Sequence, residues 1–203
     1  MESSASHAQV TAIWRYPVSS MAGERLVSAD VGATGIKGDR EWGVYDCATD
    51  RIAYPGREKR SLAVPRGHAR VGKDGALEIS TDGIAWSSPT SAASLAAMSD
   101  LFGFPADVRP YRDANGFQPR YVRSPIHLLT TVALQTLRQA LPDSVIDERR
   151  FRPNLLVDVA SGADPIPENS WIGREIRIGD VILRGTHPVV AVASRRWSRT
   201  DCR

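Results

Sequence analysis

The sequence predicts an α+β fold, mostly β, with an N-terminal barrel-like domain followed by a second domain that has a barrel core and a few helices. Short strand candidates broken by Gly and Pro fill the first half of the chain. No helix-length segment before Pro89 has helical periodicity. Beyond Pro89, helices alternate with strands without a regular βαβ order. A boundary near residue 90 therefore predicts domains over 8–90 and 91–203.

The first half is expected to form short strands. Tyr16-Pro17 ends the first of them, because proline cannot donate to a strand ladder. Asp74-Gly75 precedes the last, and this pair favours a tight hairpin turn. The expected strands are residues 10–14, 25–27 (ending near Gly32), 42–45 and 76–79.

The second half is expected to contain two helices and several strands. The first helix rests on apolar residues at i, i+3 and i+7, namely Leu95, Met98 and Phe102. The second presents Leu134, Leu137 and Leu141 on one face. Gly103 ends the first helix, Thr130 or Thr131 caps the second, and Pro142 stops it. The later strands are 154–159, a hairpin over 175–183, and 189–193.

Composition narrows the class of protein. The 203 residues are 42% hydrophobic and 24% charged, which is ordinary globular composition. No apolar run approaches the roughly 20 residues that span a bilayer, and the first nine residues lack a secretory pattern. A net charge of +3 is too small to indicate nucleic acid. Cys47 and Cys202 form no disulfide framework. We expect a cytoplasmic protein with no membrane and no nucleic-acid partner.

Three local patterns suit an anionic ligand. Ser19 and Ser20 follow a strand end near a glycine, where hydroxyls and backbone N–H groups can hold phosphate oxygens. An Asp39-Arg40 pair enters another strand, and an arginine fork suits a phosphate. A third pattern, with Arg152 and Asn154, opens an apolar strand; Asn offers a donor and an acceptor to a heterocycle edge. The alternatives are a Ser-rich turn, a surface ion pair and solvated arginines.

Common enzyme motifs do not occur in the sequence. Dinucleotide, Walker, metalloprotease and nucleophile-elbow patterns are absent. The histidines His7, His68, His127 and His187 lack metal-site spacing. We interpret His127 as a packing or capping residue, and His187 as a residue that could line a pocket.

Taken together, these patterns resemble the MOSC family. Residues 16–23 read Tyr-Pro-Val-x-Ser-x-x-Gly and residues 35–42 read Gly-x-x-Gly-Asp-Arg-x-Trp, similar to the β-barrel domain N-terminal to MOSC domains. Residues 123–129, 150–154, 168–173 and 178–181 resemble the MOSC domain itself, in the family's order. This domain type forms the C-terminal domain of molybdenum cofactor sulfurases. It also occurs in mitochondrial amidoxime-reducing proteins and their bacterial relatives.

The resemblance implies a molybdenum–pterin cofactor between the two domains. By motif matching, Ser20 and Arg40 would hold the pterin phosphate, with Ser124 and Arg152 beside it and Asn154 close to the cofactor. Ser19 belongs to the same set, although the family often has Lys there, which removes a positive charge from the expected site. The family is also associated with pyridoxal-phosphate-dependent sulfurases; this chain has no room for such a domain, so pyridoxal phosphate would act elsewhere.

The C-terminal segment departs from the family. The family typically continues into Pro-Cys-x-Arg-Cys, whose second thiolate ligates molybdenum, and a soft thiolate suits such a metal. Here Val192 occupies that position, so no metal ligand is predicted, and relative to the family the second domain is expected to be truncated at its C-terminal end. A shifted reading frame near Val190 or a natural variant would each explain this segment. Cys202 lies ten residues further on, too far to substitute easily.

The resemblance implies an oxidoreductase that reduces small N-hydroxylated or related N–O compounds. Electrons would come from a separate ferredoxin- or flavin-type protein, and the cofactor would do the redox chemistry. The sequence shows no obvious proton donor, so no catalytic residue is assigned. The alternatives are a cofactor carrier or sulfur-transfer module without substrate turnover, and an inactive truncated product.

Overall fold

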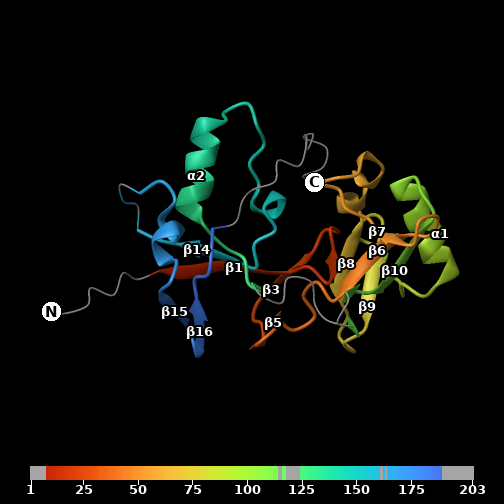
Figure 1. The fold of residues 1–203 in the computed structure, drawn as a ribbon, viewed down its shortest axis with the longest axis horizontal. Helices are drawn as coiled ribbons and strands as arrows, with labels where there is room; N and C mark the ends of the chain where they lie inside the picture. The colour runs from red at the N-terminus through yellow and green to blue at the C-terminus, as the bar shows by residue number, and fades with distance from the viewer. Residues whose placement is uncertain (1–7, 114–115, 118–123, 161, 163, 189–203) are drawn as a thin grey trace.

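The computed structural model describes residues 8–113, 116–117, 124–160, 162 and 164–188. The described chain forms two lobes (Figure 1): one carries helix α1 with strands β6 to β10, and the other carries helix α2 with β14, β15 and β16. Strand β1 (Gln9–Arg15) runs between the lobes. Strand β1 pairs with β14, so residues near the start of the described chain lie in the second lobe.

A four-stranded sheet organises the first lobe around β6 (Trp42–Asp46). β10 (Ala106–Pro110) pairs antiparallel with every residue of β6. β2 (Val18–Ser19) and β7 (Arg51–Ile52) also pair with β6. Since β10 occupies one whole edge of β6, β2 and β7 share the other edge and follow one another along it.

Shorter elements complete this half of the chain. The predicted hairpin is confirmed: β8 (His68–Val71) and β9 (Leu77–Ser80) pair antiparallel, and Gly75 in the turn has a φ of +84°. The other short elements are β4 (Val31–Gly32) with β5 (Gly35–Ile36), β11 (Arg112–Asp113) with β12 (Gly116–Phe117), and the 3-10 helices η1 (Lys59–Ser61) and η2 (Val64–Arg66).

Helix α1 (Ala92–Phe102) covers the first core, as its apolar spacing predicts. Met98 and Phe102 are buried and Leu95 packs against them. The helix ends at Gly103, whose φ of +76° suits glycine. The same core includes Val44 and Ile79, so α1 and β10 pack with the strands that precede them in the chain.

The second lobe is built on a sheet that includes the N-terminal strand. β13 (Leu128–Thr130) runs parallel to β14 (Leu155–Asp158), β14 pairs antiparallel with β1, and β1 pairs with β3 (Glu24–Leu26). The sequence predicts β1 and β14 individually, whereas their pairing joins residues more than 140 positions apart. The second lobe therefore depends on a strand from the first half of the chain.

Helix α2 (Thr131–Ala140) packs on this sheet. The Thr130 side chain caps it by accepting a hydrogen bond from the backbone N–H of Ala133 at 3.1 Å, which confirms one of the two predicted caps. Leu134 is buried, whereas Leu141 lies beyond the helix and is half exposed. The remaining elements are η3 (Glu148–Arg150), η4 (Pro167–Trp171) and the predicted hairpin of β15 (Glu175–Ile178) with β16 (Val181–Arg184).

The α+β, mostly β fold class is confirmed. Within the described residues the sheets remain open, with at most four strands in each. The predicted strand over 189–193 lies outside the described residues. No helix in the described part of the chain is long and apolar enough to cross a membrane.

Candidate functional site

Backbone strain is concentrated where the two lobes meet. Among described non-glycine residues, four have a positive φ: Ser20 (+74°), Arg40 (+54°), Asp50 (+51°) and Arg152 (+54°). Arg40 Nη2 donates to the backbone carbonyl of Arg152 at 2.9 Å, and Arg152 Nη1 donates to the carbonyl of Met21, the neighbour of Ser20. Strained residues of this kind cluster at functional sites. Three of the four thus mark one candidate site.

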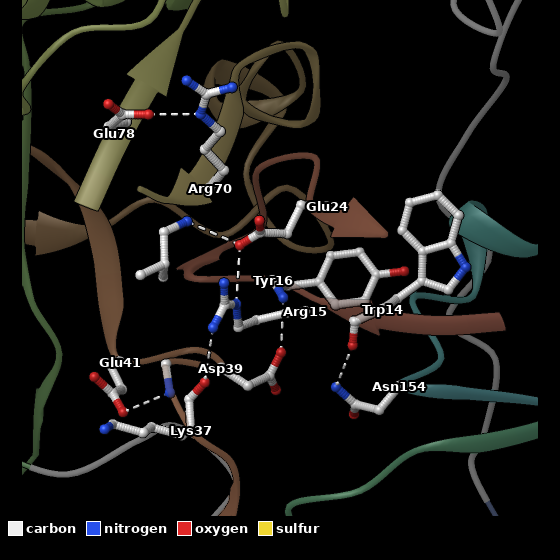
Figure 2. Close-up of polar contacts among 12 residues, drawn as sticks. Trp14, Arg15, Tyr16, Glu24, Lys37, Asp39, Glu41, Arg70, Glu78 and Asn154 are labelled. Atoms are coloured by element: carbon white, nitrogen blue, oxygen red, sulfur yellow. Dashed lines mark hydrogen bonds and ion pairs between the residues drawn. The ribbon is translucent and has the colours of Figure 1, made fainter. Parts of the chain in front are cut away.

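The ring of Tyr16 lies between two guanidinium groups at this site. Arg152 Cζ is 4.1 Å from the ring centroid and Arg40 Cζ is 5.1 Å from it. The Tyr16 side chain is only 1% exposed, and burial raises its pKa well above the usual value, although the two arginines oppose the shift. The backbone N–H of Tyr16 donates to Asp39 Oδ1 at 2.7 Å (Figure 2). Tyr16 is therefore a neutral platform that positions both arginines.

Arg40 joins the two lobes. Its Nη1 donates to the carboxylate of Asp39 and to Asn154 Oδ1 at 3.1 Å, and the residue is only 8% exposed. With the bond from Nη2 to Arg152, the guanidinium connects the loop after β5 to the segment before β14. The phosphate role predicted for Arg40 from the sequence stays a prediction; the structure shows that Arg40 holds the junction together.

Asn154 is the polar centre of the junction and is completely buried. Its Oδ1 accepts from Arg40 and from the backbone N–H of His127 at 3.1 Å, and its Nδ2 donates to the carbonyl of Trp14 at 3.2 Å (Figure 2). Its backbone also bonds to Trp14 and His127. The proposed proximity of Asn154 to a cofactor stays a prediction, and its bonds here make it a positioning residue.

The three serines predicted for the site have different surroundings. Ser19 is buried in β2, and Ser20 follows it at the strained turn. Ser124 Oγ lies 3.0 Å from Thr186 Oγ1 and 3.5 Å from His187 Nδ1. The neighbouring Pro125 packs so closely on Gly35 that a Cβ at Gly35 would lie 2.8 Å from it. The segment with Ser124 therefore contacts the loop that leads to Arg40.

His127 is neutral at physiological pH. Burial lowers its pKa to about 4, and the charge of Arg40 acts in the same direction. A protonated imidazole here would be a buried charge, which is costly to desolvate, and it would also be repelled by the positive charge of Arg40. The interpretation of His127 as a packing residue agrees with its backbone bonds to Asn154.

The site residues predicted from the sequence do not include the aromatic residues at the junction, Trp14 and Tyr16. The Tyr16 hydroxyl and Trp14 Nε1 are buried without a hydrogen-bond partner among the described residues. Their rings stack with centroids 6.4 Å apart. The signal was present in the sequence: aromatic residues at positions 14 and 16 fall on one side of an extended strand.

The donor set of the site suits an anionic group rich in oxygen atoms. Two guanidinium groups lie over the Tyr16 ring, and one of them donates to the carbonyl of Met21, the residue after Ser20. The Tyr16 hydroxyl and Trp14 Nε1 add two buried donors that have no partner among the described residues. The described residues contain no group of three or more His, Cys, Asp or Glu side chains that could hold a metal ion. Val192, at the expected ligand position, and Cys202 both lie outside the described residues.

Comparisons with known proteins agree with this architecture. A family model described as the MOSC N-terminal beta barrel domain matches residues 7–99, and one described as the MOSC domain matches residues 98–191. No curated protein and no solved structure matches the chain. The domain boundary near residue 90 stays a prediction. The two family matches follow one another in the predicted order, and the chain therefore belongs to the MOSC family, with a MOSC N-terminal beta barrel domain followed by a MOSC domain.

Proposed function

We propose that this protein binds a molybdenum–pterin cofactor at the lobe junction through the cofactor's phosphate. The observation that carries the proposal is the stack of Arg152, Tyr16 and Arg40, with strained backbone at both arginines. Charge-assisted hydrogen bonds from arginine are among the strongest that a phosphate receives. MOSC domains are the domain type of molybdenum cofactor sulfurase C-termini, which makes this ligand the natural candidate.

Each residue of the junction has a defined task in this proposal. Arg152 and Ser20 would bind the phosphate, and Ser124 would approach from the second lobe. Tyr16 holds the guanidinium groups and offers its hydroxyl. Asn154 and Asp39 keep Arg40 in place. Because Tyr16, Arg40 and Asn154 are buried, little water competes for these donors.

We further propose that the loaded protein is an oxidoreductase acting on small N-hydroxylated or related N–O compounds. The cofactor supplies the redox chemistry, and the chain supplies binding and orientation. Reduction of an N–OH group to N–H consumes two electrons and two protons and releases water. The electrons come from a separate ferredoxin- or flavin-type protein and the protons from solvent. This reaction rests on the family resemblance.

The second candidate is a cofactor carrier or sulfur-transfer module without substrate turnover. The observation that favours it is Val192, which stands where the family has a cysteine ligand and which has no donor atom for a metal. The same missing ligand is also consistent with the third alternative, an inactive product that neither carries the cofactor nor turns over a substrate.

Metal and pterin content tests the proposal directly. We expect the purified chain to retain pterin, and Arg152→Gln to lose most of it, while Arg174→Gln, an exposed arginine of the second lobe, retains it. Equal pterin content in all three proteins, or none in any, would contradict the assignment of the site.

A Val192→Cys variant separates the two functions. If it gains molybdenum and reduces an N-hydroxylated compound with an electron donor, while the natural chain holds pterin without turnover, the carrier function is correct for the natural chain. Turnover by the natural chain itself would establish the oxidoreductase. Retention of pterin without turnover in both proteins would remove the oxidoreductase from consideration.

A further inference from the structure

A cavity of about 360 Å³ lies in the first lobe, outside the arginine–tyrosine stack. It is formed by the end of β7 and the loop that follows it. Its lining residues are Arg51, Ile52, Tyr54, Arg57 and Glu58. None of these five residues belongs to the three sequence patterns that suit an anionic ligand.

The lining of this cavity is positively charged. Neither Arg51 nor Arg57 makes an ion pair within the described part of the chain. Nearby carboxylates are already paired: Asp46 lies 3.3 Å from Arg60 and Asp50 lies 2.7 Å from Arg109. Two arginines and a single carboxylate therefore line the cavity.

That carboxylate belongs to Glu58 and is engaged locally. Glu58 Oε2 accepts a hydrogen bond from the Ser61 hydroxyl at 3.3 Å, across the turn of η1. The Glu58 carboxylate is therefore held by a residue of its own turn and makes no ion pair with Arg51 or Arg57. The arginine forks remain suited to an external carboxylate or phosphate, which they can bind through two parallel hydrogen bonds.

The cavity also offers surface for an apolar body. Arg57 Cζ lies 5.3 Å from the centroid of the Tyr54 ring, so the ring holds the guanidinium group in place. Ile52 contributes an aliphatic side chain to the same lining. Aromatic and aliphatic walls with a few directed polar groups are typical of small-molecule sites.

The topology of the sheet places this cavity beside the candidate site. Ser19 pairs with Gly43, and Ile52 pairs with Tyr45 on the same edge of β6. The two pairs are two residues apart, which is about 7 Å along a strand. A Cβ at Gly43 would lie 2.8 Å from Ile52 Cδ1, so Ile52 packs directly on the residue that pairs with Ser19.

We propose that this cavity binds the anionic group of a small organic substrate, a carboxylate or phosphate on an aromatic or aliphatic body, beside Ser19 and Ser20. That the bound molecule is a substrate rests on the function proposed above, whereas the binding of an anion in this cavity does not require the cofactor. The reacting N–O group would then lie toward the junction, and the cavity would select for anionic substrates.

Isothermal titration calorimetry at low ionic strength tests the binding step with the chain as purified. Benzoate and phenyl phosphate serve as probes, and benzyl alcohol serves as the uncharged control. We expect both anions to bind and the alcohol not to. Replacing both exposed arginines, Arg51→Gln with Arg57→Gln, should weaken anion binding about tenfold or more, because each removes a charge-assisted contact.

The matched control is Arg174→Gln with Arg177→Gln, which makes the same charge change at and beside β15 in the second lobe and should leave affinity unchanged. Equal weakening in the control, unchanged affinity in the double variant, or equal binding of benzyl alcohol would overturn the proposal. A double variant that loses binding only to an acidic electron-transfer protein, and keeps benzoate, would also overturn it.

The test distinguishes failure of this inference from failure of the proposed function. Anion binding that depends on Arg51 and Arg57, in a chain that retains no pterin, would support the cavity and contradict the cofactor. In a turnover assay, the double variant should raise KM for a carboxylate-bearing N-hydroxy compound and leave kcat unchanged. The same variant should leave KM for an uncharged analogue unchanged, which a loss of fold would not do.

Discussion

The two lobes obtain their cores in different ways. The first lobe packs around a large buried cluster whose members all lie between Val18 and Val108. The second lobe has a smaller cluster, in which Ala12 from β1 packs with Leu129, Leu134 and Leu156. One core is thus local in the chain, and the other needs a strand from the opposite end of the sequence.

This difference has a consequence for the candidate site. The strand that completes the second core leads directly into Tyr16, and Arg40 and Asn154 bond across the same junction. The site therefore forms only when the second lobe has captured β1. Ligand binding at the junction should stabilise both lobes together, because it favours only the assembled state.

The largest expected effect comes from breaking the shared strand. Ala12→Asp places an unpaired carboxylate in the second core, where Ala12 is buried, and should cost about 4 kcal/mol or more. Hydrogen exchange should show loss of protection in β14 with protection retained in β6. Val27→Asp, at a fully exposed position, should change neither. Equal loss in both strands would mean that the first core is not independent.

A smaller effect is expected from removing the polar centre of the junction. Asn154→Ala removes three buried side-chain hydrogen bonds, to the Arg40 guanidinium, to the backbone N–H of His127 and to the carbonyl of Trp14, and should lower the free energy of unfolding by about 3 kcal/mol. Urea denaturation measures the change. Asn169→Ala, on the exposed surface, is the control. A loss below about 1 kcal/mol would contradict a stabilising role for the Asn154 side chain at the junction.

The two lobes should also differ in their response to acid. The folded-state pKa of His127 is about 4, below the value of 6.5 in an unfolded chain. Its stabilising contribution is therefore present above the unfolded-state pKa of 6.5 and is lost as pH falls toward 4, by roughly 2 to 3 kcal/mol near pH 4.5. The free energy of unfolding, measured for the natural chain and for His127→Gln at pH 7 and at pH 4.5, separates the effect of His127 from that of other titrating groups. We expect a smaller loss at pH 4.5 in the variant, and an equal loss in both proteins would contradict the role of His127.

His68 provides the first-lobe comparison for this experiment. Burial lowers its pKa in the same direction, and Asp82 opposes the shift. His68→Gln should therefore change the acid dependence less than His127→Gln does. The reverse order would contradict the assignment of the larger acid sensitivity to the junction.

The smallest expected effect concerns strain at the site. Ser20→Gly should stabilise the free protein by about 1 kcal/mol or less, because glycine accepts a φ of +74° without steric cost. The same change should weaken retention of pterin, since the hydroxyl is lost. Asp50→Gly relieves a similar φ away from the junction and should leave pterin retention unchanged. Thermal unfolding and pterin analysis measure the two effects.

Much of the fold could be predicted because its signals are local. The apolar spacing of Met98 and Phe102, the left-handed Gly103 and the Thr130 cap each act within a few residues. The same holds for the turn at Gly75 between β8 and β9. The motifs at Ser20, Arg40 and Arg152 could likewise be found by pattern, and the structure brings these residues together.

Other features of the site could not be predicted from the sequence. The bonds of Arg40 to Asn154 and Arg152 span more than 110 residues, and no local pattern encodes such a pairing. The proximity of Ile52 to Ser19 depends on both strands choosing the same edge of β6. Sequence spacing contains no information about the edge that a short strand selects.

The sequence by itself therefore determined the elements, their order and the chemical types of the site residues, since propensity and turn chemistry act over a few positions. Only the tertiary structure decided that β1 completes the second lobe and that Tyr16 separates two arginines. The physical reason is that contacts between distant segments first cost the entropy of closing the long loop between them. They become favourable only when the chain folds and hydrophobic surface from both halves is removed from water together.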